Sequence, residues 1–323
     1  MRAFPVAATL AAILSVPLSL PAQPTSHLNP VVDLLASGKA VFGLYAPANR
    51  RPRPGGPALP ADSVKSPAQL AREAAAYGKA DYLFDGSMEY NFDASFPVFA
   101  EFATGLDGAG TRKAGRLTHP LFVKTTEVAP DPALAVTRIS KQLNEGVTGM
   151  VLVDVQSAEE TRQGIAAMRF RSQGGTRPDD VGKAPARWGV SEAEYRARAD
   201  VWPLNPKGEL INFTIVESKA GLAKVREIAA VPGVGVLFPG AGTLRGVFTT
   251  TDAAGNRTFD EAAWEAAIQS VLAACKEFKV RCGYPAGAAD IEMRIKQGFS
   301  VFIIGWGDQG FKAVDIGRAA TGR

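Results

Sequence analysis

One pattern recurs along this chain: a short apolar run ends in polar residues and passes directly into the start of a helix. The run from Gly149 to Val155 does so before a helix that begins near Ala158, and the run from Leu210 to Val216 does so at Glu217. Repeated strand-to-helix units build a parallel α/β barrel, in which the polar residues at the strand ends meet at one mouth. We therefore expect a barrel that carries its chemistry at that mouth.

The pattern extends over most of the 323 residues, of which 46% are hydrophobic, enough to bury a full core. Apolar runs predict strands at 40–46, 80–84, 120–125, 149–155, 210–216, 235–238, 281–285 and 300–304. Amphipathic segments between them predict helices, including 66–77, 132–144, 158–169, 220–230 and 262–278. This alternation fits one closed (β/α)8 TIM barrel, and no linker marks a second domain.

Two inserts interrupt the alternation. The first, 48–62, contains Arg50, Arg51 and Arg53 among prolines and glycines and follows the first strand on the side of the mouth. Its composition is compatible with a solvated loop and with a ligand-binding segment. The second, 171–208, separates the fourth and fifth strands and contains a short predicted helix at 191–200.

The N-terminus has the composition of a secretory signal peptide. Arg2 precedes an apolar stretch that is interrupted by Pro17, and Ala22 offers a small residue at the cleavage position. The alternative, an uncleaved membrane anchor, is disfavoured because the stretch is short for a spanning helix. We expect residues 1–22 to be removed and residues 23–323 to form the barrel of a periplasmic or secreted protein.

Charge and cysteine content limit the partners and leave the redox state open. The formal charge of +4 and the isoelectric point near 9.0 come from scattered Lys and Arg residues, so nucleic-acid binding is not expected. After signal cleavage we expect no membrane association and a small-molecule substrate. Cys275 and Cys282 can form a bridge in an oxidising compartment or remain two buried thiols, and their spacing does not decide between these states.

Several motifs in the second half of the chain carry a family resemblance. An Arg187-Trp188 pair is followed by Tyr195, and a strand from Gly233 to Phe238 is followed by the turn Pro239-Gly240-Ala241-Gly242. In this order the motifs resemble the HpcH/HpaI aldolase and citrate lyase family, whose members are metal-dependent carbon–carbon lyases with a barrel of the phosphoenolpyruvate/pyruvate type. The resemblance implies such a barrel, lyase chemistry and a homo-oligomer.

The resemblance implies a divalent metal, Mg or Mn, held by Glu217 at the end of the fifth strand. The alternative role for Glu217 is to cap the helix that follows. The family's second metal carboxylate is replaced by Gly242, so a metal would be held weakly unless Asp85, Glu89 or Glu127 supplied another oxygen. Metal binding is therefore doubtful from the sequence.

The family's catalytic base and substrate clamp also differ in this chain. After the second strand the chain has Asp85-Gly86-Ser87-Met88-Glu89, which lacks the family's histidine. We expect Asp85 and Glu89 to replace its acid/base function, because His27 lies beside the segment expected to be cleaved and His119 begins the third strand at the opposite end of the barrel. Lys124 occupies the position of the family's substrate-binding Arg and is expected to bind the substrate; a Schiff base on Lys124 is an alternative.

Further residues at the strand ends are expected to bind substrate. Aromatic side chains at Tyr45, Tyr284 and Trp306, together with Gln156, are expected to line the mouth. The backbone amides of Gly240, Ala241 and Gly242 are expected to hold an anionic group of the substrate.

These observations predict an aldolase-like carbon–carbon lyase that acts on a small oxygenated or 2-oxo acid substrate and stabilises an enolate at the barrel mouth. Two alternatives remain open at this point. One is a metal-independent lyase or isomerase acting on an aromatic or polyol substrate, and the other is a barrel that binds a ligand without catalysis.

Overall fold

Eight parallel strands form the closed barrel that the sequence predicts. The computed structural model describes residues 26–49, 60 and 63–323. The barrel strands are β1 Val41–Tyr45, β2 Tyr82–Asp85, β5 Leu121–Lys124, β6 Gly149–Leu152, β8 Leu210–Val216, β9 Val236–Pro239, β12 Arg281–Pro285 and β13 Val301–Ile304. They pair in this order, and β6 pairs with β8 in parallel register to continue the ring. All of them match predicted strands.

The barrel interior is filled with buried side chains. Tyr82, Phe122 and Phe213 form one aromatic cluster at its centre, and all three are fully buried. Gly149 faces the ring of Phe122, and a Cβ on this glycine would meet that ring at 1.9 Å. Small residues therefore stand opposite large rings inside the barrel, as close packing requires.

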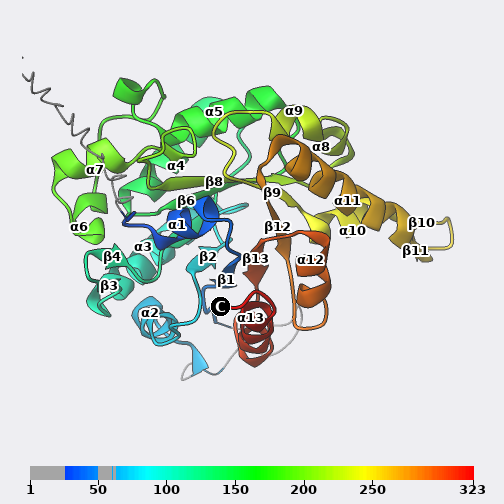
Figure 1. Cartoon of the computed structure of the whole chain (residues 1–323), viewed down its shortest axis with the longest axis horizontal. Helices are drawn as coiled ribbons and strands as arrows, with labels where there is room; N and C mark the ends of the chain where they lie inside the picture. Colours follow the sequence, from blue (N-terminus) through cyan, green and yellow to red (C-terminus); the bar gives the residue numbers. More distant parts are fainter. Residues whose placement is uncertain (1–25, 50–59, 61–62) are drawn as a thin grey trace, which may run out of the picture.

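Helices surround the barrel (Figure 1). Apart from two helices in the second insert, those between consecutive barrel strands are α2 Pro67–Ala75, α3 Phe92–Gly108, α4 Pro132–Asn144, α5 Ala158–Met168, α8 Lys219–Ala223, α9 Val225–Ala229, α10 Ala241–Val247, α11 Glu261–Phe278 and α12 Ile291–Gln297, with α13 Asp308–Ala320 after β13. The single helix predicted at 220–230 is divided into α8 and α9 at Lys224. Helices α3, α10, α12 and α13 were not among the helices named from the sequence, and Pro97 lies inside α3.

The bottom of the barrel, at the N-terminal ends of its strands, is closed by α1 Pro30–Ala36 (Figure 1). Val31, Val32 and Leu35 of this helix are fully buried in the interior cluster. Asn29 caps the helix, and its side chain accepts a hydrogen bond from the backbone N–H of Val31 at 3.1 Å. This end is therefore a packed floor.

The structure describes the second predicted insert but only a small part of the first. Most of the first insert, at 48–62, lies outside the described residues, so its proposed roles remain untested. The second forms α6 Ala184–Trp188, α7 Glu192–Arg198 and the short strand β7 Val201–Trp202, which extends the sheet beside β8. Fully buried Arg177 stacks on Phe170 and donates a hydrogen bond to the Tyr195 hydroxyl. Arg187, Trp188 and Tyr195 of the family-like motif are buried in the same segment, which therefore forms a packed scaffold before β8.

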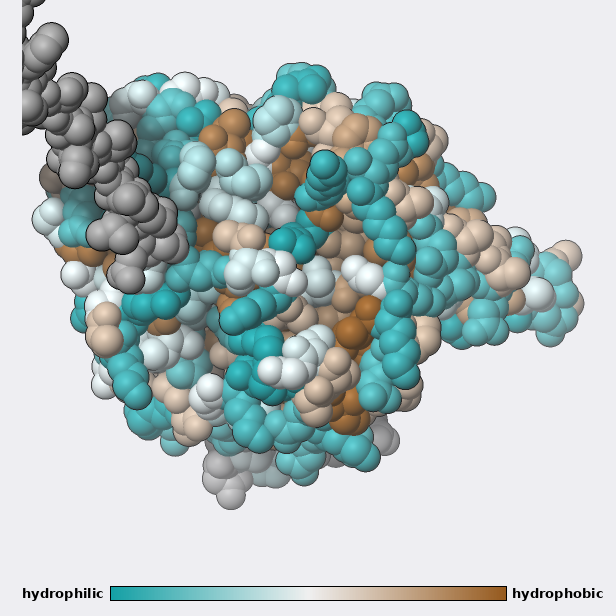
Figure 2. All heavy atoms as spheres, viewed as in Figure 1, coloured by the Kyte–Doolittle hydropathy of each residue, from teal (hydrophilic) through white to brown (hydrophobic). Residues whose placement is uncertain are grey.

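Two short hairpins decorate the barrel. One consists of β3 Arg112–Lys113 and β4 Arg116–Leu117, and the other of β10 Thr249–Thr251 and β11 Arg257–Phe259. The β10–β11 hairpin extends away from the body of the molecule (Figures 1 and 2). On the face drawn in Figure 2, hydrophilic residues are widespread and hydrophobic residues appear in small separate groups.

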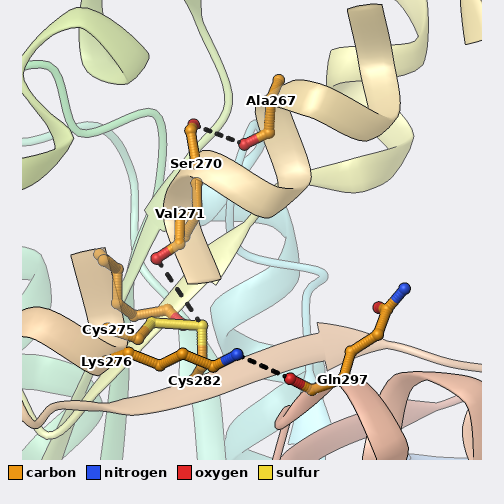
Figure 3. Close-up of a disulfide and its surroundings, with 8 residues drawn as sticks. Ala267, Ser270, Val271, Cys275, Lys276, Cys282 and Gln297 are labelled. Atoms are coloured by element: carbon orange, nitrogen blue, oxygen red, sulfur yellow. Dashed lines mark hydrogen bonds between the residues drawn. A yellow bond between two sulfur atoms is a disulfide. The ribbon is translucent and has the colours of Figure 1, made fainter. Parts of the chain in front are cut away.

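The cysteine question is settled by the structure: Cys275 and Cys282 form a disulfide (Figure 3). The bridge joins the end of α11 to the beginning of β12, and the two Cα atoms lie 5.6 Å apart. Both cysteines are buried. The bridge therefore fixes this helix to its strand near the barrel floor.

Candidate active site

The mouth of the barrel collects charged side chains from neighbouring strand ends. Asp85 ends β2, Lys124 ends β5, and Glu217 follows β8 directly. Because parallel strands all end at one rim, residues separated by more than a hundred positions lie on the same face. The structure thus places these three predicted site residues at one end of the barrel.

Lys124 forms an ion pair with Glu89. The Lys124 Nζ lies 2.8 Å from Glu89 Oε2, and the side chains are only 17% and 10% exposed. Glu89 comes from the loop between β2 and α3. Asp85 fixes the start of this loop because its Oδ1 accepts a hydrogen bond from the backbone N–H of Ser87 at 2.7 Å. At such burial the attraction is stronger than between surface charges, so the pair has a defined geometry.

Glu217 is nearly buried beside the strand that follows it in the ring. Its side chain is 6% exposed, and its Oε1 accepts a hydrogen bond from the backbone N–H of Asp154 at 3.1 Å. A Cβ on Gly240 would meet Glu217 Oε2 at 2.5 Å. A glycine at 240 therefore makes room for the carboxylate, which explains this part of the turn after β9.

Asp154 is a mouth residue whose importance the sequence analysis missed. Its backbone is left-handed, with φ of 42°, an uncommon conformation for a residue with a side chain. Its Oδ2 accepts a hydrogen bond from the exposed Gln156 side chain at 3.0 Å, whereas Oδ1 is buried with no hydrogen-bond partner. The left-handed turn points the Asp154 N–H at Glu217, and this hydrogen bond joins the ends of the neighbouring strands β6 and β8 at the mouth.

A cavity of about 350 Å³ opens at the side of the mouth formed by β1, β2 and β5. One side is polar and includes Tyr45, Asp85, Glu89 and Lys124. The other side is apolar and comes from α2 and α3, with Leu70, Val98, Phe99 and Phe102. This apolar wall was not apparent from the sequence, from which no helix over α3 was named. The volume is within the usual range for small-molecule sites.

Two tyrosines report the electrostatic field at the mouth. Burial, followed by the charges of Glu89, Asp85 and Glu217, raises the pKa of Tyr45. The charge of Glu89, with smaller effects from burial and from Glu217 and Glu127, raises the pKa of Tyr90. Both hydroxyls therefore stay protonated and can donate hydrogen bonds. Tyr90 is 85% exposed and was not predicted; its position directly after Glu89 was the available signal.

The donor set does not fit the two-carboxylate metal site that the resemblance implies. Glu217 has one oxygen engaged by Asp154, and Gly242 supplies no ligand; a Cβ there would meet nothing within 4 Å. Within residues 26–49, 60 and 63–323, no group of three or more His, Cys, Asp or Glu side chains is arranged to hold a metal. Glu89 is paired with Lys124, and Glu127 is exposed. These residues give no basis for a step through a metal ion.

Both histidines lie away from the mouth, as expected. His27 Nδ1 is 3.5 Å from Glu209, which precedes β8 at the bottom of the barrel. His119 precedes β5, and its Nε2 lies 3.2 Å from the backbone oxygen of Tyr77. Proton transfer at the mouth therefore falls to carboxylate, lysine or tyrosine groups.

Tyr284 and Trp306 were predicted to line the mouth, but neither lines the mouth cavity. Tyr284 is buried on the outer side of β12, where its hydroxyl accepts a hydrogen bond from Arg294 at 3.1 Å. Trp306 packs between α2 and α13 and donates to Glu73 Oε1 at 3.2 Å. Successive side chains of a strand point to opposite faces, so Tyr284 faces the helices. Tyr45, by contrast, lines the cavity.

The turn after β9 also corrects one expectation. The backbone N–H of Gly240 donates to the Val216 backbone oxygen at 2.9 Å, so this amide is already used within the barrel. Ala241 and Gly242 open α10, where the first amides of a helix lack intrahelical partners. Their predicted role in binding an anionic group remains a prediction.

Comparison with known proteins agrees with this architecture. A hydroxypyruvate/pyruvate aldolase of Chromohalobacter salexigens is 31% identical over 188 residues, which cover 58% of this chain and 67% of that protein. A 2-dehydro-3,6-dideoxy-6-sulfogluconate aldolase of Pseudomonas putida is 26% identical over 178 residues, covering 53% of this chain and 61% of that protein. The chain thus spans about two thirds of the first relative and less of the second. No family model matches the chain.

Solved structures show the same fold over nearly the whole chain. A HpcH/HpaI aldolase/citrate lyase family protein from Burkholderia cenocepacia has a TM-score of 0.63 at 18% identity and covers 90% of this chain and 96% of its own. A HpcH/HpaI aldolase from Desulfitobacterium hafniense has a TM-score of 0.60 at 19% identity, covering 89% and 93%. A related protein from Mycobacterium tuberculosis was solved with magnesium and acetate.

The fold and the polar mouth define an α/β barrel with a site at the C-terminal ends of its strands. The chain belongs to the HpcH/HpaI aldolase and citrate lyase family.

Proposed function

We propose that this protein is an aldolase-type carbon–carbon lyase that acts on a small oxygenated organic molecule at the barrel mouth. The observation that carries the proposal is the buried Lys124–Glu89 ion pair, which lies beside Asp85 in a cavity of an aldolase-family barrel. The names of the aldolase relatives support a substrate with a carbonyl and a hydroxyl group, as in an aldol.

The proposed reaction is a retro-aldol cleavage. Asp85 accepts the proton of the substrate's β-hydroxyl group, the carbon–carbon bond breaks, and its electron pair moves toward the carbonyl to form an enolate. The Lys124 ammonium donates a hydrogen bond to the developing enolate oxygen and stabilises its charge. Proton return to the enolate carbon completes the products, an aldehyde and a carbonyl compound.

Three further groups position the reactants in this proposal. Glu89 orients Lys124 through the 2.8 Å ion pair, and the free oxygen of Glu217 accepts a hydrogen bond from a substrate hydroxyl. Tyr45, with its raised pKa, donates from the same polar side of the cavity. A Schiff base on Lys124 is the alternative, and it would require Lys124 to leave its 2.8 Å ion pair with Glu89.

The test is retro-aldol turnover of the purified mature protein, measured as aldehyde release from 4-hydroxy-2-oxopentanoate and from 4-hydroxy-4-phenylbutan-2-one. Lys124→Met should lower kcat/KM for the cleaved compound by roughly 10²–10³-fold, because it removes the enolate's hydrogen-bond donor. Lys79→Met is the matched control, since Lys79 forms an exposed ion pair with Asp315. Turnover that survives in Lys124→Met would contradict the proposal, and ligand binding without any turnover would favour the non-catalytic alternative.

We also propose that the mature protein works in an oxidising compartment outside the cytoplasm. The proposal is supported by the signal-like composition of residues 1–22 and by the Cys275–Cys282 disulfide. In the described part of the chain, no helix is both long and apolar enough to cross a bilayer. Intact-mass measurement of exported protein should show the loss of residues up to Ala22, and an uncleaved soluble chain would contradict the proposal.

A further inference from the structure

The apolar wall of the mouth cavity is part of the protein core. Phe99 and Phe102 of α3 are 1% and 5% exposed, and both also belong to the main hydrophobic cluster. Helix α3 packs closely on α2, since a Cβ on Gly105 would meet the Ala71 Cβ at 2.7 Å. The wall is therefore preformed and cannot collapse into the cavity without disturbing the core.

One residue of this wall is unusually exposed. Val98 is 55% exposed although it lines the cavity together with Leu70 and the two phenylalanines. A single exposed valine needs no explanation, but here it continues a concave apolar surface. The surface directly faces the polar side of the same cavity. A ligand that fills the cavity must therefore present an apolar part to α2 and α3.

The described residues of the polar side carry a net negative charge. Of the cavity-lining residues that the structure describes, Lys124 is the one cation, and Glu89 neutralises it at 2.8 Å. Asp85 adds a further carboxylate to the lining, and Glu217 contributes to the field that raises the Tyr45 pKa. Among the described residues of the lining, a carboxylate group on the substrate would meet this negative field and no free cationic partner, which is unfavourable in a partly buried site.

We propose that this cavity selects an uncharged aldol whose ring-sized apolar body packs on the α2–α3 wall and whose oxygenated end faces the Lys124–Glu89 pair. This inference rests on the proposed function and adds the substrate class. The proposed substrate is a neutral molecule with an aromatic body. A small 2-oxo acid, by contrast, would leave the apolar half of the cavity unfilled.

Three probes test separately how the aromatic ring and the carboxylate of a ligand affect binding. They are 4-hydroxy-4-phenylbutan-2-one, which is neutral and has a ring; 4-hydroxy-2-oxo-4-phenylbutanoate, which adds a carboxylate; and 4-hydroxypentan-2-one, which is neutral and lacks the ring. Binding is measured by ligand-observed NMR and calorimetry, and aldehyde release is measured separately. The neutral ring probe should bind at least roughly tenfold more tightly than either of the others, a difference of about 1.4 kcal/mol.

A matched pair of variants locates the effect. Val98→Lys places a cation on the exposed edge of the wall, so it should weaken the neutral ring probe several-fold and improve the acid. Met293→Lys makes a comparable change on α12, outside the cavity, at a residue that is 43% exposed, and should leave all three affinities unchanged. Far-ultraviolet circular dichroism and the melting temperature verify that both variants are folded.

The outcomes distinguish this inference from the proposed function. Acid binding equal to or tighter than neutral binding, or unchanged ring binding in Val98→Lys, overturns the inference. Cleavage of aldols with no preference for the ring overturns the inference and supports the lyase. Selective binding of the neutral ring probe without cleavage of any aldol supports the inference and overturns the lyase.

Discussion

Two buried glutamates stand at the two ends of one strand and have different surroundings. Glu209 immediately precedes β8 and Glu217 immediately follows it, and they are 2% and 6% exposed. Glu209 accepts hydrogen bonds from the backbone N–H groups of Leu28 and Asn29 at 3.0 and 2.9 Å, and Arg198 lies 3.3 Å away. Glu217 accepts one described hydrogen bond, from Asp154.

This difference distinguishes the floor of the barrel, where buried carboxylates stabilise the structure, from the mouth, where we place the chemistry. At the floor, Glu209 and Asp81 have their charge satisfied; Asp81 accepts from the Phe42 N–H and from Arg323, both at 2.8 Å. At the mouth, Asp85, Glu89, Asp154 and Glu217 each have a single described partner, and one buried oxygen of Asp154 has none. Buried charge without full compensation is costly, so groups in this state indicate a place where a ligand completes the hydrogen bonding.

The largest expected effect on stability comes from the floor. Glu209→Gln should lower the free energy of unfolding by about 2–3 kcal/mol, because the amide removes the charge held by Arg198 and sets an NH2 group against backbone donors. Chemical denaturation measures the effect, and Glu227→Gln on the exposed side of α9 is the control. Turnover per folded molecule should be unchanged. A Glu209→Gln variant that is as stable as the unmodified protein but has reduced turnover would contradict the structural role assigned to the floor.

A smaller effect should appear in the pH dependence of stability. The hydrogen bond to Glu209 raises the pKa of His27 above 6.5, against the lowering effect of burial. A raised folded pKa contributes stability that is fully present below pH 6.5 and is lost as the pH rises through the folded pKa. The melting temperature of the unmodified protein, relative to His27→Gln, should therefore decline from mildly acidic to mildly alkaline pH. An equal difference at all pH values would show that His27 does not titrate against Glu209.

The sequence predicted the barrel well because each strand is a short apolar run between turn residues. It did not predict α3, whose aromatic residues and internal Pro97 obscure its period, and it did not reveal the break at Lys224 between α8 and α9. The cysteine spacing left the disulfide open because bridging depends on where α11 meets β12.

The site was predicted in part. Asp85, Lys124 and Glu217 end or follow strands, so their position at the mouth followed from barrel geometry. Tyr284 was misplaced because a one-residue alternation decides whether a strand side chain faces the mouth or the helices. The Glu89–Lys124 pair and the left-handed turn at Asp154 depend on loop conformations that no sequence period encodes.

The most direct test of the contrast between the two ends is turnover of Glu217→Gln, with its melting temperature measured on the same sample. Glutamine keeps an oxygen that can accept from Asp154, so the melting temperature should change less than in Glu209→Gln. Loss of the carboxylate should lower kcat/KM for aldol cleavage by about 10²-fold or more. A variant that melts at much lower temperature yet cleaves the aldol at the unmodified rate would contradict the assignment and make Glu217 a structural residue like Glu209.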